Sequence, residues 1–150
     1  MRIGLRKNQR GAALLETAVT LPLILLISVA IFEFGRAYQT WQVLTNGARE
    51  GARVSVINGT SPDQVKAAVI KYANVGGIRS CSDGPAPCIA PEHITVDQGV
   101  DLGGRSGSQI TIQYPFDFIV LNPIARMVAG GSRAGQPITM SAVAVMRNES

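Results

Sequence analysis

Residues 12–34 of the chain have the sequence AALLETAVTLPLILLISVAIFEF, and this stretch decides how the rest must fold. Leu, Ile, Val and Ala dominate it, and no charged residue lies between Thr17 and Phe32. At about 1.5 Å per residue, a helix over residues 12–34 measures roughly 34 Å, enough to cross a hydrocarbon core of about 30 Å. A soluble domain of this size needs no such segment, so the stretch predicts a transmembrane helix.

The leader MRIGLRKNQR precedes Gly11 and carries four of the fourteen basic residues of the chain. Without residues 1–11 the chain has ten basic and ten acidic residues, so the formal net charge of +4 belongs to the leader. A neutral mature chain offers no basic patch for phosphates, which argues against nucleic-acid binding. Basic residues before an apolar span instead predict a cytoplasmic N-terminus and a C-terminal domain across the membrane.

Glu16 lies one helical turn into the apolar stretch. A charged side chain at the centre of a membrane helix costs about 2.5 kcal/mol or more, and it usually has a partner. Cleavage after Gly11 would create a positively charged α-amine at Ala12, which a carboxylate one turn away, on the same or a neighbouring subunit, can neutralise. The plainer interpretation is that Glu16 reaches the headgroups and Gly11 merely marks the helix start.

Gly11 followed five residues later by Glu16 resembles the processing site of class III (type IVb-like) prepilins. The resemblance implies that a membrane prepilin peptidase cuts after Gly11 and makes Ala12 the new N-terminus. Thr17 stands where that family has an aromatic residue. A secretory signal peptide is the competing interpretation, because residues 28–30 (Ser-Val-Ala) fit a small-x-small cleavage site, although apolar residues continue beyond them.

Beyond Glu33 the pattern becomes amphipathic and predicts that the helix continues to about Ile57, so that residues 35–57 extend it outside the membrane. Apolar and small residues recur there every three or four positions: Phe34, Tyr38, Trp41, Thr45, Ala48 and Ala52. Each glycine in this region weakens the helix by about 1 kcal/mol relative to Ala, and a break near Gly35 is the alternative.

Three blocks stand out in this N-terminal region: the E-x-A-x-x-x-P run from Glu16 to Pro22, the E-F-G-R block at residues 33–36, and the N-G-A-R-E-G-A-R block at residues 46–53. Together they resemble the TadE-like family of pilin-related proteins. The resemblance implies a pseudopilin-like minor subunit of a tight-adherence (Flp-type) pilus apparatus in the bacterial inner membrane, with its C-terminal domain in the periplasm or in a surface pilus. It also implies three partners: the membrane, the prepilin peptidase and other pilus or pseudopilin subunits.

Residues 58–150 predict one extracytoplasmic domain. Ser61 and Gln64 form a capping box around Pro62, which predicts a second helix that ends at Gly76-Gly77 and buries Val65, Val69 and Tyr72. Alternating patterns predict strands over residues 93–97, 109–116 and 138–147. This order of elements predicts an α+β fold, pilin-like, in which the long N-terminal helix covers one face of an antiparallel sheet.

A short helix is predicted between the last two strands. Asn122 would cap it, Pro123 would be its first residue, and its buried face would hold Ile124, Met127 and Val128. That apolar face would pack on the sheet or touch the membrane surface.

Cys81 and Cys88 flank the Gly- and Pro-rich loop SDGPAP. Outside the cytoplasm the default for such a pair is a disulfide, which in so small a loop contributes roughly 2–3 kcal/mol in the chain-entropy model. Zinc is the alternative, but the six-residue gap is not a knuckle and His93 is the only histidine.

The sequence contains no G-x-S-x-G, H-E-x-x-H or Walker loop, so it predicts no enzymatic activity, no cofactor and no small-molecule substrate. Asp97 and Asp101 lack the ligand density of a calcium loop. The remaining alternatives are an uncleaved single-pass periplasmic scaffold or binding protein, and a secreted soluble domain.

Overall fold

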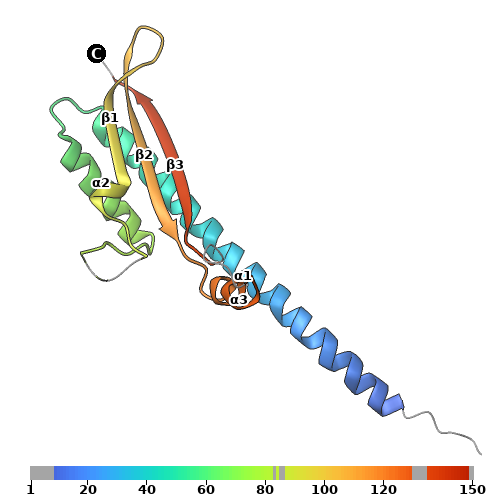
Figure 1. Ribbon diagram of the computed structural model, residues 1–150. Helices are drawn as coiled ribbons and strands as arrows, with labels where there is room; N and C mark the ends of the chain where they lie inside the picture. Colours follow the sequence, from blue (N-terminus) through green and yellow to red (C-terminus); the bar gives the residue numbers. More distant parts are fainter. Residues whose placement is uncertain (1–8, 83, 85–86, 130–134, 149–150) are drawn as a thin grey trace, which may run out of the picture.

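The structure is a computed structural model that describes residues 9–82, 84, 87–129 and 135–148. Its longest element is α1 (Gln9–Ser55), a single helix of 47 residues. The N-terminal part of α1 projects out of the domain, while its C-terminal part lies against the sheet (Figure 1). The helix passes through Pro22 and Gly35 without a break and ends two residues before the predicted end at Ile57.

Helix α2 (Pro62–Val75) begins and ends where the sequence predicts. The hydroxyl of Ser61 accepts a hydrogen bond from the Gln64 amide, and the Ser61 amide donates to the Gln64 side chain. Gly77 ends the helix with a φ of 89°, a backbone conformation that glycine adopts without strain. The predicted burial of Tyr72 is wrong, because that side chain is 39% exposed and Ala73 takes the core position instead.

The sheet contains three antiparallel strands in chain order, β1 (Ile94–Asp101), β2 (Ser106–Phe116) and β3 (Ile138–Arg147). The 3₁₀ turn η1 (Pro91–His93) leads into β1. Strands β1 and β2 each extend beyond their predicted bounds, because they form a hairpin closed by the Leu102 amide on the Arg105 carbonyl at 2.8 Å. The α+β fold class is therefore confirmed, and β3 spans the predicted residues 138–147.

The core lies between one face of the sheet and the two helices α1 and α2. The alternating residues Ile110, Ile112, Tyr114 and Phe116 of β2 supply its centre, as the period-two pattern predicts. They meet small residues of α1 and branched residues of α2: Ala48, Ala52, Val65 and Val69. The other face of the sheet carries exposed side chains such as Val143 and Val145.

Cys81 and Cys88 form a disulfide, so the first of the two cysteine interpretations is confirmed. The bond closes the loop between α2 and η1, whose ends are also joined by backbone hydrogen bonds between Cys81 and Ile89 and between Ile89 and Arg79. The crosslink therefore secures a connection that is otherwise rich in Gly and Pro.

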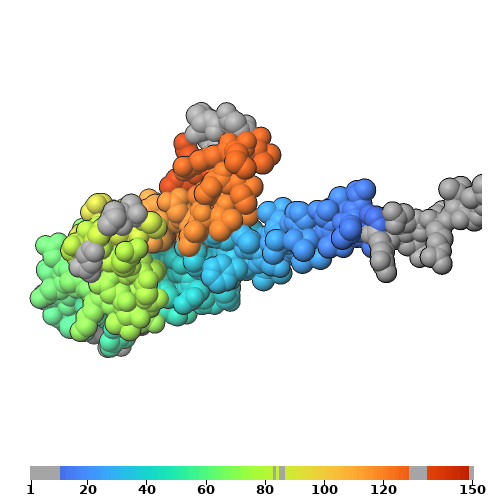
Figure 2. Space-filling view, turned by 90° about the horizontal axis from the view of Figure 1, so that it is seen from below, coloured from blue at the N-terminus to red at the C-terminus, as the bar shows by residue number. Residues whose placement is uncertain are grey.

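Helix α3 (Leu121–Ala129) differs from its prediction in its start and in its exposed face. It begins before Pro123, and the Asn122 side chain donates to the Asp117 carboxylate instead of capping the helix. Met127 and Val128 are 83% and 80% exposed, so their predicted burial is wrong. Figure 2 shows the segment that contains α3 projecting sideways from α1.

Candidate functional site

The predicted processing junction lies in the first turns of α1. Gly11, Ala12 and Glu16 are exposed and helical, and a methyl group added at Gly11 would have no neighbour within 4 Å. Within the described part of the chain, the Glu16 carboxylate forms no hydrogen bond or ion pair. The junction is therefore accessible, and its carboxylate is available to a partner outside the chain.

The apolar surface of α1 lies outside the folded domain. Apart from the half-buried Val29, its large apolar side chains from Leu14 to Phe32 are 44–72% exposed, and none of the most apolar window of the helix is buried. Among the described residues, α1 is the only helix long and apolar enough to cross a membrane. The hydroxyls of Thr17, Thr20 and Ser28 donate hydrogen bonds to backbone carbonyls four residues earlier, which satisfies these polar groups inside the helix. The helix is thus consistent with a membrane anchor.

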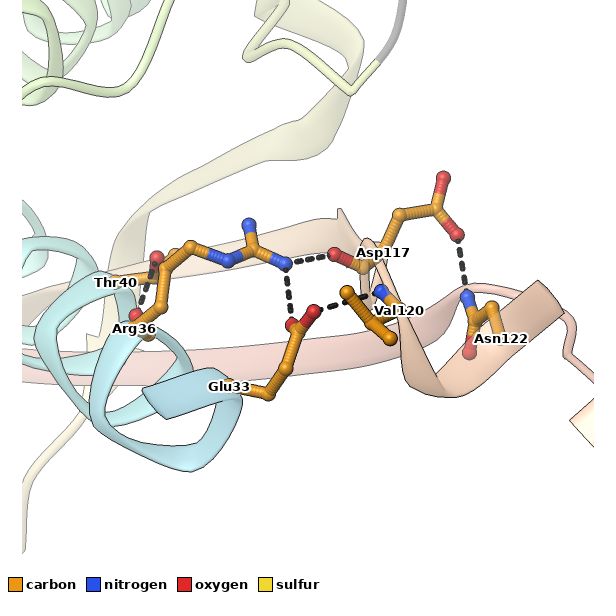
Figure 3. Close-up of polar contacts among 6 residues, drawn as sticks. All are labelled: Glu33, Arg36, Thr40, Asp117, Val120 and Asn122. Carbon is orange, nitrogen blue, oxygen red and sulfur yellow. Dashed lines mark hydrogen bonds and ion pairs between the residues drawn. The ribbon is translucent and has the colours of Figure 1, made fainter. Parts of the chain in front are cut away.

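A polar cluster joins α1 to the connection between β2 and α3, where the apolar span meets the domain (Figure 3). The Glu33 carboxylate is completely buried, accepting from the Arg36 guanidinium at 3.1 Å and from the Val120 amide at 2.8 Å. The same Arg36 nitrogen donates to the Asp117 carbonyl. One helix turn thereby holds both ends of the short connection from residue 117 to residue 120.

The sequence places this cluster through the i, i+3 spacing of Glu33 and Arg36, which puts both side chains on one face of α1. The Arg36 guanidinium also lies 4.4 Å from the centre of the Phe116 ring, a cation–π contact that covers the pair from the side of the sheet. Its Nε atom has no hydrogen-bond partner among the described residues. Removal of Arg36 would leave the buried Glu33 carboxylate without its counterion, so the cluster is a positioning device.

The E-F-G-R block thus joins α1 to Val120, a residue 87 positions beyond Glu33. The pattern of the block alone does not reveal this contact. The block was singled out only through the family resemblance. The one local signal was an acidic and a basic residue three positions apart at the end of an apolar span.

The N-G-A-R-E-G-A-R block packs α1 on the domain. Gly51 faces α2 so closely that an added Cβ would lie 2.5 Å from the Val69 Cγ2 atom, and Ala48 and Ala52 beside it are buried. On the opposite face, Arg53 forms two hydrogen bonds to the Glu50 carboxylate at 2.7 and 2.9 Å. Gly47 and Gly51 therefore permit close packing of α1 against α2 and β2.

A cavity of about 230 Å³ lies beside the polar cluster, with Arg36, Arg79 and Tyr114 among its lining residues. Burial raises the pKa of the Tyr114 phenol above its ordinary value, and the nearby arginine charges offset that increase only in part. Arg36 and Arg79 give the cavity a positively charged wall.

Asp97 and Asp101 accept backbone hydrogen bonds in the β1–β2 hairpin. The Asp97 carboxylate accepts from the Gly99 amide at 3.0 Å, and the Asp101 carboxylate accepts from the Gly104 amide at 2.7 Å. Over the described ranges, no group of three or more His, Cys, Asp or Glu residues could hold a metal ion. Stabilisation of the turns therefore explains why acidic residues stand at these two positions.

An apolar helix that projects from a small α+β domain defines the class of the protein, a candidate single-anchor membrane protein. Residues 11–53 match the model of the family described as TadE-like protein, so the chain is TadE-like over that segment. No curated protein and no solved structure matches the chain. The family match suggests a role in the tight-adherence (Tad) pilus system, whose TadE-like proteins are pilus-system components and not known enzymes.

Proposed function

We propose that this protein is a pseudopilin-like minor subunit that acts in assembly of tight-adherence pili. The observation that carries the proposal is the exposed apolar surface of α1, in a segment that matches the TadE-like family from Gly11 onward. Such a surface needs lipid or other apolar helices as its partner. In the inner membrane, residues 12–34 would supply the anchor, with the leader in the cytoplasm and residues 58–150 in the periplasm or in a surface pilus.

Processing is the second part of the proposal. A prepilin peptidase cuts after Gly11, and the new α-amine of Ala12 pairs with the Glu16 carboxylate of the same or a neighbouring subunit. The exposure of both residues and the lack of a partner for Glu16 within the described chain support this arrangement. The anchor helices of several subunits then pack together while the domains engage other pilus proteins.

The deciding experiment is the intact mass and N-terminal sequence of the protein recovered from native membranes. We expect a chain that begins at Ala12, and we expect Gly11→Val to block this cut because the peptidase site would be changed. Gly35→Val is the matched control, since both glycines lie in α1 with no atom within 4 Å of an added Cβ. An uncut wild-type chain would support the uncleaved scaffold instead, and a start at Ile31 would support a secreted domain.

Glu16→Ala separates insertion from assembly. We expect the variant to enter the membrane normally, because removing a charge from an apolar span favours insertion, but to lose surface piliation. Membrane fractionation and electron microscopy of the cell surface measure the two properties separately. Normal piliation in the variant would contradict the proposed role of the carboxylate.

A further inference from the structure

We propose that α3 is a second membrane contact, an amphipathic helix that lies in the outer leaflet of the bilayer beside the anchor. This inference rests on the membrane-anchor part of the proposed function. It concerns a different segment of the chain, whose apolar face has no other assigned role.

The first support is the position of α3 along α1. Ile124 of α3 lines an apolar hollow together with Pro22, Leu25, Leu26 and Val29 of the anchor. At about 1.5 Å per residue, these anchor positions lie roughly 8–18 Å below Phe34, the outer end of the predicted span. Helix α3 therefore lies beside the outer half of the span and not beside the domain.

The second support is the direction of the helix. In Figure 1, α1 lies across the page while α3 is seen nearly along its axis, so the two helices cross steeply. Figure 2 agrees, because the segment that contains α3 projects sideways from α1. If α1 crosses the bilayer, α3 lies close to the membrane plane, which is the orientation of interfacial helices.

The third support is the division of α3 into two faces. Ile124, Met127 and Val128 follow the i, i+3, i+4 spacing and share one face, on which the last two are more than three-quarters exposed. The polar side chains lie elsewhere: Asn122 donates to Asp117, and Arg126 donates to the Gly135 carbonyl. The apolar face thus joins Ile124, which lies beside the embedded part of α1, to the exposed side chains of Met127 and Val128.

The polar cluster fixes the depth of α3 along the predicted membrane span. Glu33 accepts from the Val120 amide and Arg36 donates to the Asp117 carbonyl, so the residues directly before α3 are held against α1 just inside the outer end of the span. The apolar face of α3 is continuous with the exposed apolar surface of α1, which the anchor presents to lipid. Lipid is therefore the occupant of the α3 face, and Met127 and Val128 enter the acyl region.

The test uses single cysteines that carry an environment-sensitive fluorophore in the full chain, reconstituted in phosphatidylcholine–phosphatidylglycerol vesicles that contain lipids with a quencher on the acyl chain. The native cysteines are joined in a disulfide and do not react. Val128→Cys is compared with Val75→Cys, a valine in the last turn of α2 that is 85% exposed, and with Leu25→Cys in the anchor. We expect loss of fluorescence at positions 128 and 25 and none at position 75, with the depth at position 128 about 5–10 Å below the headgroups.

Each other outcome overturns the inference in a distinguishable way. Quenching at position 25 with a signal at position 128 like that at position 75 would leave the anchor intact and place α3 in water. An unquenched position 25 would remove the anchor itself and with it this inference. Shielding of position 128 that disappears when the protein is diluted in lipid would identify a second copy of the chain as the occupant.

Discussion

Replacement of Glu33 tests whether the polar cluster holds the β2–α3 connection to the long helix. Glu33→Ala removes the acceptor of the Val120 amide and the counterion of Arg36 together. A hydrogen bond to a charged group contributes about 1.5–3 kcal/mol, and a partly exposed ion pair adds about 0.2–1 kcal/mol. The ion-pair value is the one for solvated pairs because the Arg36 side chain is 29% exposed. The connection should lose about 2–4 kcal/mol of local stability.

Hydrogen–deuterium exchange of the full chain in detergent micelles or vesicles measures this loss directly. At about 1.4 kcal/mol per factor of ten, the Val120 amide should exchange at least about 30-fold faster in Glu33→Ala than in the wild type. Glu33→Gln keeps an acceptor for that amide but loses the charge, so we expect an intermediate acceleration. Protection should change in residues 117–129 while the amides of β1 and β2 stay protected.

Glu50→Gln is the matched control. Glu50 also pairs with an arginine three residues later on α1, but its side chain is 32% exposed and that of Arg53 is 65% exposed. Such a solvated pair contributes little to stability, so exchange around residues 117–129 should not change. The reasoning is refuted if Glu33→Ala leaves the Val120 amide protected, or if the Glu50 variant accelerates its exchange equally.

Two further predictions concern the packed domain. Gly51→Ala should lower the thermal midpoint, because its Cβ would lie 2.5 Å from Val69 in a filled core and overpacking costs about 1–3 kcal/mol. Gly35→Ala should not lower it, because the space around Gly35 is open. Equal midpoints for the two variants would contradict this reasoning. Burial raises the pKa of Tyr114, so at high pH the folded chain keeps a proton that the unfolded chain releases. The contribution of this proton to the free energy of unfolding is fully present below about pH 10 and decreases as the pH rises above it. Denaturant midpoints at about pH 8 and about pH 11 should therefore differ more for the wild type than for Tyr114→Phe, and parallel changes would contradict the assignment.

Local signals in the sequence were sufficient for most elements of the fold. The capping box at Ser61 and the glycine pair after Val75 set both ends of α2, because caps are decided by residues within one helical turn. The alternation along β2 identified its buried face for the same reason, since side chains on a strand alternate whatever the partner strand is. The cysteine pair needed only its spacing and an oxidising compartment.

The candidate sites were only partly accessible to the sequence. Gly11, Ala12 and Glu16 were identified from spacing and resemblance, and their processing is still a prediction. The contact between Glu33 and Val120 could not be foreseen, because it depends on where the chain returns after passing through the whole sheet. The same holds for Tyr72 and Ala73, adjacent positions of α2 whose burial depends on the angle at which α2 lies on α1.

By itself, the sequence determined that this protein has a long apolar helix, a small α+β domain and a disulfide loop, because composition and periodicity act over neighbouring residues. Only the tertiary structure decided between the continuous helix, which runs from Gln9 to Ser55, and a break near Gly35. Packing of Gly47 and Gly51 against α2 and β2 compensates for the weak helix propensity of these two residues. The tertiary structure also placed Ile124 of α3 beside the anchor and left Met127 and Val128 exposed. A periodic pattern identifies an apolar face, but the surface that covers it is chosen by parts of the chain far away in sequence.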